Sequence, residues 1–170
     1  MFCIELAKTN DIPLVEKLLD EAFGLDRFEK TAYRLRDGVE QIWDLAFVVR
    51  GEEGLLATLQ FWPIVVGEGP DRQEALLLGP IAVCDSCRGK GAGRALMVKG
   101  LDKAREMGYQ RVILVGDEDY YKKVGFSRSL AEGLEMPGPV DKNRLLAHAL
   151  VPGGMDGVQG MICKSTDIVK

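Results

Sequence analysis

Hydrophobic residues follow two different periods along the 170-residue chain, and the changes of period predict its elements. Residues 2–6 alternate as a short strand. Apolar residues then recur at helical spacing as far as Gly24, which is expected to end a first helix. Thr9 or Asn10 is expected to cap this helix, and Pro13 is compatible with its first turn.

A weaker helical pattern over residues 27–36 precedes two segments that are typical of strands. Residues 45–49 and 55–66 are rich in β-forming side chains and flank a turn at 51–54, so they predict an antiparallel hairpin. Pro63 lies inside the second segment and has no N–H for a ladder hydrogen bond. A bulge or a sheet edge is therefore expected at this position.

Residues 76–126 carry the clearest pattern in the chain. The apolar run 76–83 predicts a strand, a glycine-rich turn follows, and Met97, Leu101 and Ala104 share one face of a helix that should end at Gly108. Residues 111–115 are continuously apolar, as in a central strand that is covered on both faces. Together they predict a βαβ unit with a right-handed crossover.

The last part of the chain predicts shorter elements. Residues 117–124 are expected to be a short helical segment, 130–142 a loop, 144–151 a strand and 160–163 one further strand. Neither an internal repeat nor a linker interrupts the sequence. The chain is therefore predicted to be a single α/β domain over residues 1–170.

Composition narrows the classes of partner. The net charge of −4 argues against broad binding to nucleic acids or anionic membranes, which both depend on a summed positive field. The local positive charge around Arg88 can still serve one small anion. No apolar run is long enough to span a bilayer, and the start of the chain lacks the pattern of a signal peptide, so a cytoplasmic location is expected.

Four cysteines raise the question of metal or redox chemistry. Cys84 and Cys87 form a C-x-x-C pair, but His148 is the only histidine, which leaves too few ligands for a structural zinc site. Two reduced thiols at a strand end are favoured. A redox dithiol remains an alternative, because the pair lies just before a predicted helix N-terminus. Cys3 and Cys163 are expected to be small buried hydrophobes.

The glycine-rich turn combines flexible backbone with positive charge. Its glycines allow the close approach of a ligand, and the first turn of the helix directs free N–H groups toward it, so an anion, most often a phosphate, is expected there. A P-loop would need Lys-Ser or Lys-Thr at a spacing that is not present. A dinucleotide-binding turn would need a third glycine where Arg94 stands.

The turn and its surroundings resemble the GCN5-related N-acetyltransferase (GNAT) family. The resemblance rests on Arg88-x-x-Gly91-x-Gly93 after a strand and on the later segment Tyr121-x-x-x-Gly125-Phe126, and it extends over most of the chain. Residues 78–83 and 116–126 more narrowly resemble the YhbS-type branch of predicted acetyltransferases. The family implies a mixed, mostly antiparallel sheet of about six to seven strands flanked by about four helices.

The resemblance also implies a function. It implies an acetyl-CoA-dependent N-acetyltransferase without a metal, which transfers the acetyl group to a primary amine of a small molecule or a protein. Family members are often homodimers. The acceptor site would be shaped by residues 23–38 and 130–142, whose mixed charges give no sign of a strongly cationic substrate. The alternative is a non-catalytic acyl-CoA-binding or sensor domain of the same fold.

Family membership would also give roles to individual residues. The backbone of residues 81–83 would polarise the acetyl carbonyl, and the glycine-rich turn with its basic side chains would bind the pyrophosphate. The residues implied in binding acetyl-CoA are Ile81, Ala82, Val83, Arg88, Gly89, Lys90, Gly91, Ala92, Gly93, Arg94 and Tyr120.

Tyr121 is the candidate general acid. A phenol, with an ordinary pKa of about 10, is protonated at neutral pH and suited to give its proton to a leaving thiolate. The alternative is an aromatic ring that only packs beside Phe126. No motif selects the base that would deprotonate the amine: Glu68, Asp71 and Glu74 lie near the start of the strand, and His148 is more often a structural residue in such a position.

Overall fold

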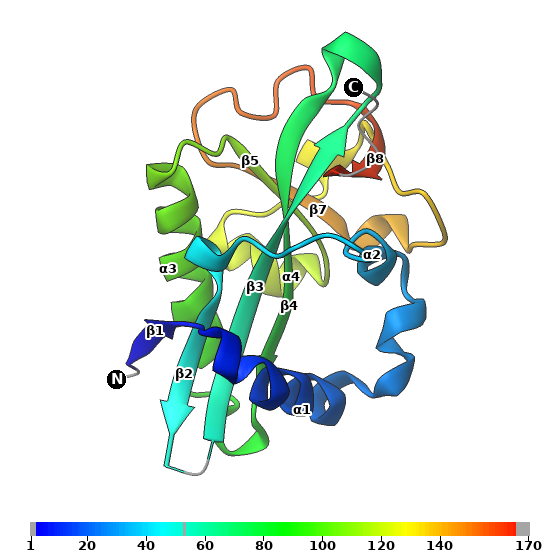
Figure 1. Ribbon diagram of the computed structural model, residues 1–170. Coiled ribbons are helices and arrows are strands. Elements are labelled where there is room, and N and C mark those ends of the chain that lie inside the picture. The colour runs from blue at the N-terminus through cyan, green and yellow to red at the C-terminus, as the bar shows by residue number, and fades with distance from the viewer. Residues whose placement is uncertain (1–2, 53, 166–170) are drawn as a thin grey trace.

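The computed structural model describes residues 3–52 and 54–165 and shows one mixed sheet with helices on both faces (Figure 1). The strands are β1 (Ile4–Leu6), β2 (Phe47–Gly51), β3 (Gly54–Val66), β4 (Gln73–Val83), β5 (Arg111–Val115), β6 (Leu134–Glu135), β7 (Leu145–Ala149) and β8 (Gly160–Lys164). The α-helices of the described residues are α1 (Ile12–Phe23), α2 (Thr31–Arg34), α3 (Ala92–Glu106) and α4 (Glu118–Tyr121).

The sheet has the order β1-β2-β3-β4-β5-β7 and is mostly antiparallel. Its parallel pairs are β4 with β5 and β6 with β8, and β8 lies antiparallel to the end of β3. The predicted fold class is therefore confirmed. The described residues form eight strands instead of the expected six to seven, because the segment 130–142, predicted as a loop, contains the two-residue β6, which pairs with the predicted late strand β8.

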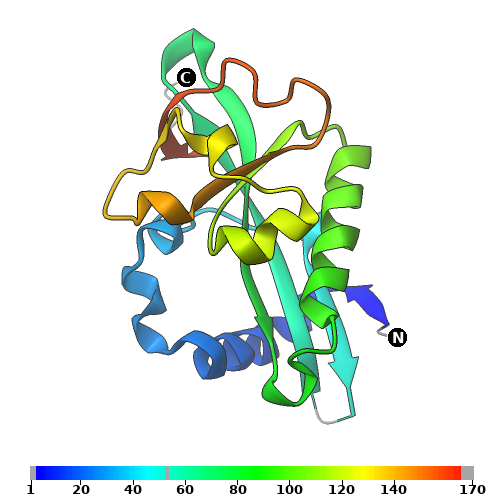
Figure 2. The same cartoon turned by 180° about the vertical axis from the view of Figure 1, so that it is seen from behind.

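Helix α3 covers one face of the sheet (Figure 2). The predicted apolar stripe of Met97, Leu101 and Ala104 is buried there. Gly100 allows a close approach, since a Cβ atom at this position would lie 2.7 Å from Cε1 of Phe61. The predicted strand–helix–strand unit is thus present as β4, α3 and β5.

Helix α1 covers the opposite face. Val15, Leu18 and Leu19 pack against Val48 and Ala82, whose side chains point away from α3. The segment after α1 differs from the single helix predicted for residues 27–36. It forms a 3-10 helix at Leu25–Glu29 and the short α2, because the backbone is extended at the residue between them.

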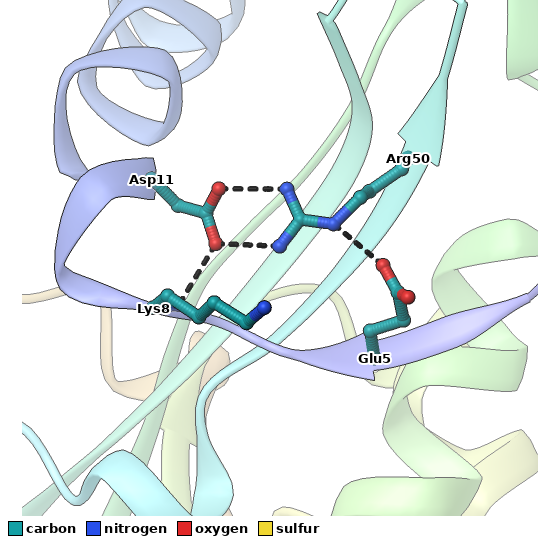
Figure 3. A network of polar contacts seen from close by, with 4 residues as sticks. All are labelled: Glu5, Lys8, Asp11 and Arg50. Atoms are coloured by element: carbon teal, nitrogen blue, oxygen red, sulfur yellow. Dashed lines mark hydrogen bonds and ion pairs between the residues drawn. The ribbon is translucent and has the colours of Figure 1, made fainter.

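The start of α1 is tied to the sheet edge by a polar network (Figure 3). Arg50 of β2 donates two hydrogen bonds to the carboxylate of Asp11, at 2.7 and 2.8 Å, and a third at 2.5 Å to Glu5. The backbone N–H of Lys8 also donates to Asp11. The expected caps Thr9 and Asn10 lie in a preceding 3-10 turn, and Asp11 occupies the cap position.

Pro63 lies at a local edge of the sheet. It pairs with Leu76 on one side, whereas on the other side β2 pairs only up to Leu59 and β8 begins at Ile64. The bulge lies in β4 instead, because Gly79 and its successor Pro80 both face the single residue 60. The expected edge at Pro63 is confirmed, and the bulge appears on the partner strand.

None of the helices in residues 3–52 and 54–165 is long and apolar enough to cross a membrane. The cytoplasmic location and the single domain over residues 1–170 stay predictions. Of the predicted first strand, residue 2 lies outside the described residues.

Candidate active site

Strands β4 and β5 separate in the middle of the sheet. In the described residues they pair at Leu76 with Val112 and at Leu77 with Ile113, and the pairing ends there. Strand β4 continues to Val83 along β3 alone. The bulge at Gly79 and Pro80 begins directly after the last pair with β5. A wedge-shaped gap is therefore open between the two parallel strands.

A cavity of about 530 Å³ occupies this gap. Its walls come from β4, from the end of β5, from the segment around α2 on one face of the sheet and from Tyr121 of α4 on the other. Residues 139–141 close a further side. Because its walls belong to both faces, the cavity passes through the sheet where the strands separate.

Tyr121 lines this cavity close to the end of β5. Its ring packs edge-on against Tyr120 and Phe126, and a methyl group at Gly116 would overlap it. Burial raises the pKa of the Tyr121 phenol to about 12, and Tyr120 adds to the shift. The ring of Tyr121 is therefore packed beside Phe126, as one alternative predicts. Its hydroxyl stays protonated at neutral pH, as the other alternative, a general acid, requires.

The glycine-rich turn lies at the N-terminus of α3. Gly89 and Gly91 have φ angles of 77° and 87°, which side chains rarely adopt, and the space around both is open. The first amides of α3 have no partner within the helix. Arg88 and Lys90 are exposed, and Arg88 forms an ion pair with Asp85 at 3.2 Å. The turn can therefore approach an anion with backbone and charge together.

Four of the predicted residues come together beside this turn. A Cβ atom on Gly93 would lie 3.0 Å from the hydroxyl oxygen of Tyr120, 3.5 Å from Val83 and 3.7 Å from Ile81. The helix start, the end of β4 and α4 thus meet around Gly93. Of the remaining predicted residues, Ala92 is buried and Arg94 is exposed on α3.

The backbone of β4 turns alternate amides toward the gap. The N–H of Cys84 donates to Leu56 of the neighbouring hairpin strand at 2.7 Å. Because amide direction alternates along a strand, the N–H of Ala82 also faces β3, and those of Ile81 and Val83 face the side that β5 has left. The side chain of Ala82 packs toward α1.

The residues considered as bases lie outside the cavity. Glu68, Asp71 and Glu74 are exposed at the far end of the β3–β4 hairpin. His148 packs against Phe126 instead, and burial, followed by Arg105, lowers its pKa. The carboxylates that line the cavity belong to three exposed residues, Asp26, Glu29 and Asp141.

Two buried arginines line the cavity, and the sequence reasoning did not single them out. Arg27 is paired with Glu16 at 2.6 Å and with Asp20. Arg36 stacks on Tyr33, with its guanidinium carbon 4.1 Å from the ring centre. One sequence signal could have pointed to Arg36. Tyr33 and Arg36 are three residues apart in a helical pattern, and residues at this spacing are neighbours on one face of a helix.

Cys3, Cys84 and Cys87 are free thiols. Cys87 is buried, whereas Cys84 is half-buried with its sulfur 3.1 Å from the hydroxyl of Ser86. Burial raises the pKa of the Cys84 thiol, but hydrogen bonds with Ser86 and Cys87 outweigh this effect and lower it. Cys3 is exposed and Cys163 half-buried, so their expected burial is wrong. Cys3 lies directly before the edge strand β1, and Cys163 lies in the short strand β8, which pairs only with the end of β3 and with β6 in the described residues.

The described residues contain no cluster of three or more histidine, cysteine, aspartate or glutamate side chains that could bind a metal ion.

Comparison with known proteins identifies the class to which this fold and cavity belong. A model of the acetyltransferase (GNAT) family matches residues 12–126. The uncharacterized N-acetyltransferase YhbS of Escherichia coli K12 is 30% identical over 153 residues, which make up 89% of this chain and 89% of that protein. The chain therefore belongs to the GNAT family of acetyl-CoA-dependent N-acetyltransferases, as the sequence predicts.

Solved structures agree with this assignment. The crystal structure of Escherichia coli YhbS in complex with CoA has a TM-score of 0.79 and 28% identity, covering 96% of this chain and 89% of that one. A GNAT family acetyltransferase from Brucella melitensis, solved with acetyl-CoA, has a TM-score of 0.70, and the match covers 96% of this chain and 95% of that one. At 20% identity, the second comparison shows the fold alone.

Proposed function

We propose that the protein transfers an acetyl group from acetyl-CoA to a primary amine, and that the transfer takes place in the gap between β4 and β5. The observation that carries this proposal is the cavity, which passes through the sheet and contains Tyr121. Acetyl-CoA supplies the activated acetyl group as a thioester. The acceptor amine is a group of a small molecule or a protein.

The donor side is the face that carries α3. We assign the pyrophosphate to the backbone amides from Gly89 to Gly93, with Arg88, Lys90 and Arg94 contributing charge. Support comes from the open space at Gly89 and Gly91, where no side chain would obstruct the approach of a phosphate. The hydroxyl of Tyr120, which lies next to Gly93, would add a further hydrogen bond.

The reacting centre is the end of the gap. The amides of Ile81 and Val83 would donate to the thioester carbonyl oxygen and stabilise negative charge that develops there. The amine nitrogen attacks the carbonyl carbon, a C–N bond forms and the C–S bond breaks. Tyr121 gives its proton to the leaving sulfur, and the nitrogen of the neutral amine loses one proton to solvent or to a carboxylate at the cavity rim. The Tyr121 phenolate then takes a proton back from solvent.

A turnover assay with matched binding data tests this proposal. Thiol release from acetyl-CoA would be measured with a panel of primary amines, and CoA binding would be measured separately by calorimetry. We expect saturable CoA binding and amine-dependent thiol release. CoA binding without turnover of any amine would favour the sensor domain, and neither binding nor turnover would contradict the proposal as a whole.

The dithiol alternative can be tested in the same assays. A double variant, Cys84→Ser with Cys87→Ser, should keep the CoA affinity and the thiol release of the wild type. A change of either value upon oxidation of the wild type alone would support a redox role. The possible homodimer also stays a prediction, which the mass in solution would test.

A further inference from the structure

Arg36 is a buried cation without a counter-charge. The residue is only 9% exposed, and its Nε and Nη1 atoms are buried without a hydrogen-bond partner. No carboxylate of the described residues forms an ion pair with it. Its close neighbours are the rings of Tyr33 and Trp62, at 4.1 and 5.9 Å from the guanidinium carbon.

This arrangement is costly for the free protein. A buried charge loses its hydration, and removal from water without a paired anion costs several kcal/mol in typical cases. The same burial lowers the pKa of Arg36 to about 10, and Tyr33 offsets part of this shift. At that pKa the guanidinium keeps its charge at neutral pH. A ligand anion would supply the missing partner.

The guanidinium lies at the wall of the cavity, on the acceptor face. Arg36 and Gly79 both line the cavity, and a Cβ atom on Gly79 would be 3.2 Å from Nη2 of Arg36. The hydroxyl of Tyr33, another lining residue, is also buried without a partner. Because Leu35 packs with Leu77 on the face opposite α3, Arg36 lies across the sheet from the glycine-rich turn.

We infer that the acceptor is an amine that also carries a carboxylate, and that Arg36 binds this carboxylate with help from the Tyr33 hydroxyl. The inference rests on the proposed function and gives it a substrate class. A planar carboxylate matches the donor edge of a guanidinium. A single negative charge on the ligand would neutralise the unpaired guanidinium of Arg36. The other buried arginine, Arg27, already forms ion pairs with Glu16 and Asp20.

Matched acceptors test the inference on the wild-type protein. L-leucine would be compared with L-leucinamide and with 3-methylbutylamine, which keep the amine but lack the carboxylate. We expect a kcat/KM at least about tenfold higher for the amino acid, because a hydrogen bond to a charged group contributes about 1.5–3 kcal/mol. Equal values for all three would overturn the inference while leaving the proposed acetyl transfer intact. A preference for O-phosphoethanolamine over every amino acid tested would also overturn it.

Variants of two arginines from the same cavity sharpen the test. Arg36→Gln should raise the KM for the amino acid by at least about tenfold and remove its preference over the amide, with the KM for acetyl-CoA unchanged. Arg36→Lys should restore part of the preference. Arg34→Gln is the matched control, because Arg34 lines the same cavity but is exposed. If Arg36→Gln lowered kcat/KM equally for the amino acid and the amide, Arg36 would have only a structural role.

A binding measurement gives a readout without turnover. In a Trp43→Phe background, Trp62 is the only tryptophan, and it lies close to Arg36. L-leucine should change its fluorescence saturably, L-leucinamide should bind at least about tenfold more weakly, and Arg36→Gln should remove the difference. Absence of saturable binding for L-leucine, glycine and β-alanine alike would contradict the inference. If CoA still bound, the donor site would be unaffected by that result.

Discussion

The environment of Tyr121 is compatible with both roles predicted for it, a general acid and a packed aromatic. The ring packs against Phe126 as a core aromatic would, and Tyr121 also lines the cavity. The burial that packs the ring also raises the pKa of the phenol to about 12. Packing therefore maintains the protonated form that a general acid needs.

Replacement of Tyr121 by phenylalanine should mainly reduce kcat. Loss of a general acid typically costs about 10²–10⁴-fold, and the KM for acetyl-CoA should stay within about twofold because only a hydroxyl is removed. Since the folded pKa is raised, the wild-type rate should not fall through deprotonation of Tyr121 below about pH 10. Steady-state kinetics between pH 6 and about 10 would check both statements.

Tyr109→Phe is the control for that variant. Tyr109 packs at the edge of the same core but lies outside the cavity, so its hydroxyl should be dispensable for turnover. An unchanged kcat in Tyr121→Phe would remove Tyr121 from the chemistry. The leaving thiolate would then have to take its proton from solvent.

At the residue scale, sequence reasoning can name candidate site residues where a motif exists. The glycine-rich turn and Tyr121 follow fixed spacings, and the structure brings Gly93, Tyr120 and the end of β4 together. Arg36 belongs to no motif. Its importance comes from burial and from the absence of a partner among the described residues, and both are properties of tertiary packing that single-sequence patterns do not contain.

At the scale of elements, the sheet and α3 were predicted closely because their periods are strong. The segment 25–36 was not, since its charges and apolar residues fit a helix and a loop equally well, and an extended residue divides it. The sheet edge predicted as one alternative at Pro63 is present, whereas the bulge in β4 was not predicted. Pro63 tolerates a local edge, while the bulge depends on how β4 leaves its partner strand.

The turn at the start of α3 gives a prediction for this element. Gly91→Ala should cost about 1 kcal/mol of stability, because Gly91 has a φ angle of 87°, and should raise the KM for acetyl-CoA several-fold by disturbing the amides that we assign to the pyrophosphate. Chemical denaturation and kinetics measure the two effects.

Gly108→Ala is the matched control at the other end of the helix. Gly108 has a φ angle of 94° and open space around it, so the cost in stability should be similar. Its KM for acetyl-CoA should equal that of the wild type. If both variants changed KM alike, the effect of Gly91→Ala would reflect general destabilisation and not the anion site.

On the scale of the whole molecule, the two faces of the sheet carry different tasks in the proposed reaction. The donor face is built on a strong motif and a long helix. The acceptor face depends on α1, which is fixed by polar contacts at both ends: Asp11 with Arg50 at its start, and Arg27 with Glu16 and Asp20 beyond its end. The position of the acceptor segment therefore depends on ion pairs that the sequence pattern does not reveal.

The network around Asp11 makes the stability of the whole molecule depend on acid pH. The hydrogen bonds from Arg50 lower the pKa of Asp11 from 3.8 to about 2, while burial opposes the shift. A lowered folded-state pKa adds stability that is fully present above the unfolded pKa of 3.8 and is lost as the pH falls toward about 2. Since Arg50 is 36% exposed, we expect a discounted contribution of about 1–2 kcal/mol at neutral pH.

The free energy of unfolding of Asp11→Asn, measured with urea at pH 7, should therefore be about 1–2 kcal/mol lower than that of the wild type. This difference should shrink steadily between about pH 4 and pH 2. Asp119→Asn is the control, because Asp119 is 98% exposed and its ion-pair partner, Lys122, lies in the 3-10 turn directly after α4. A difference for Asp11→Asn that stayed constant down to pH 2 would show that packing, and not the ion pair with Arg50, secures α1 to the sheet. Helix α1 would then be fixed by its apolar contacts with Val48 and Ala82 and by the ion pairs of Arg27 with Glu16 and Asp20.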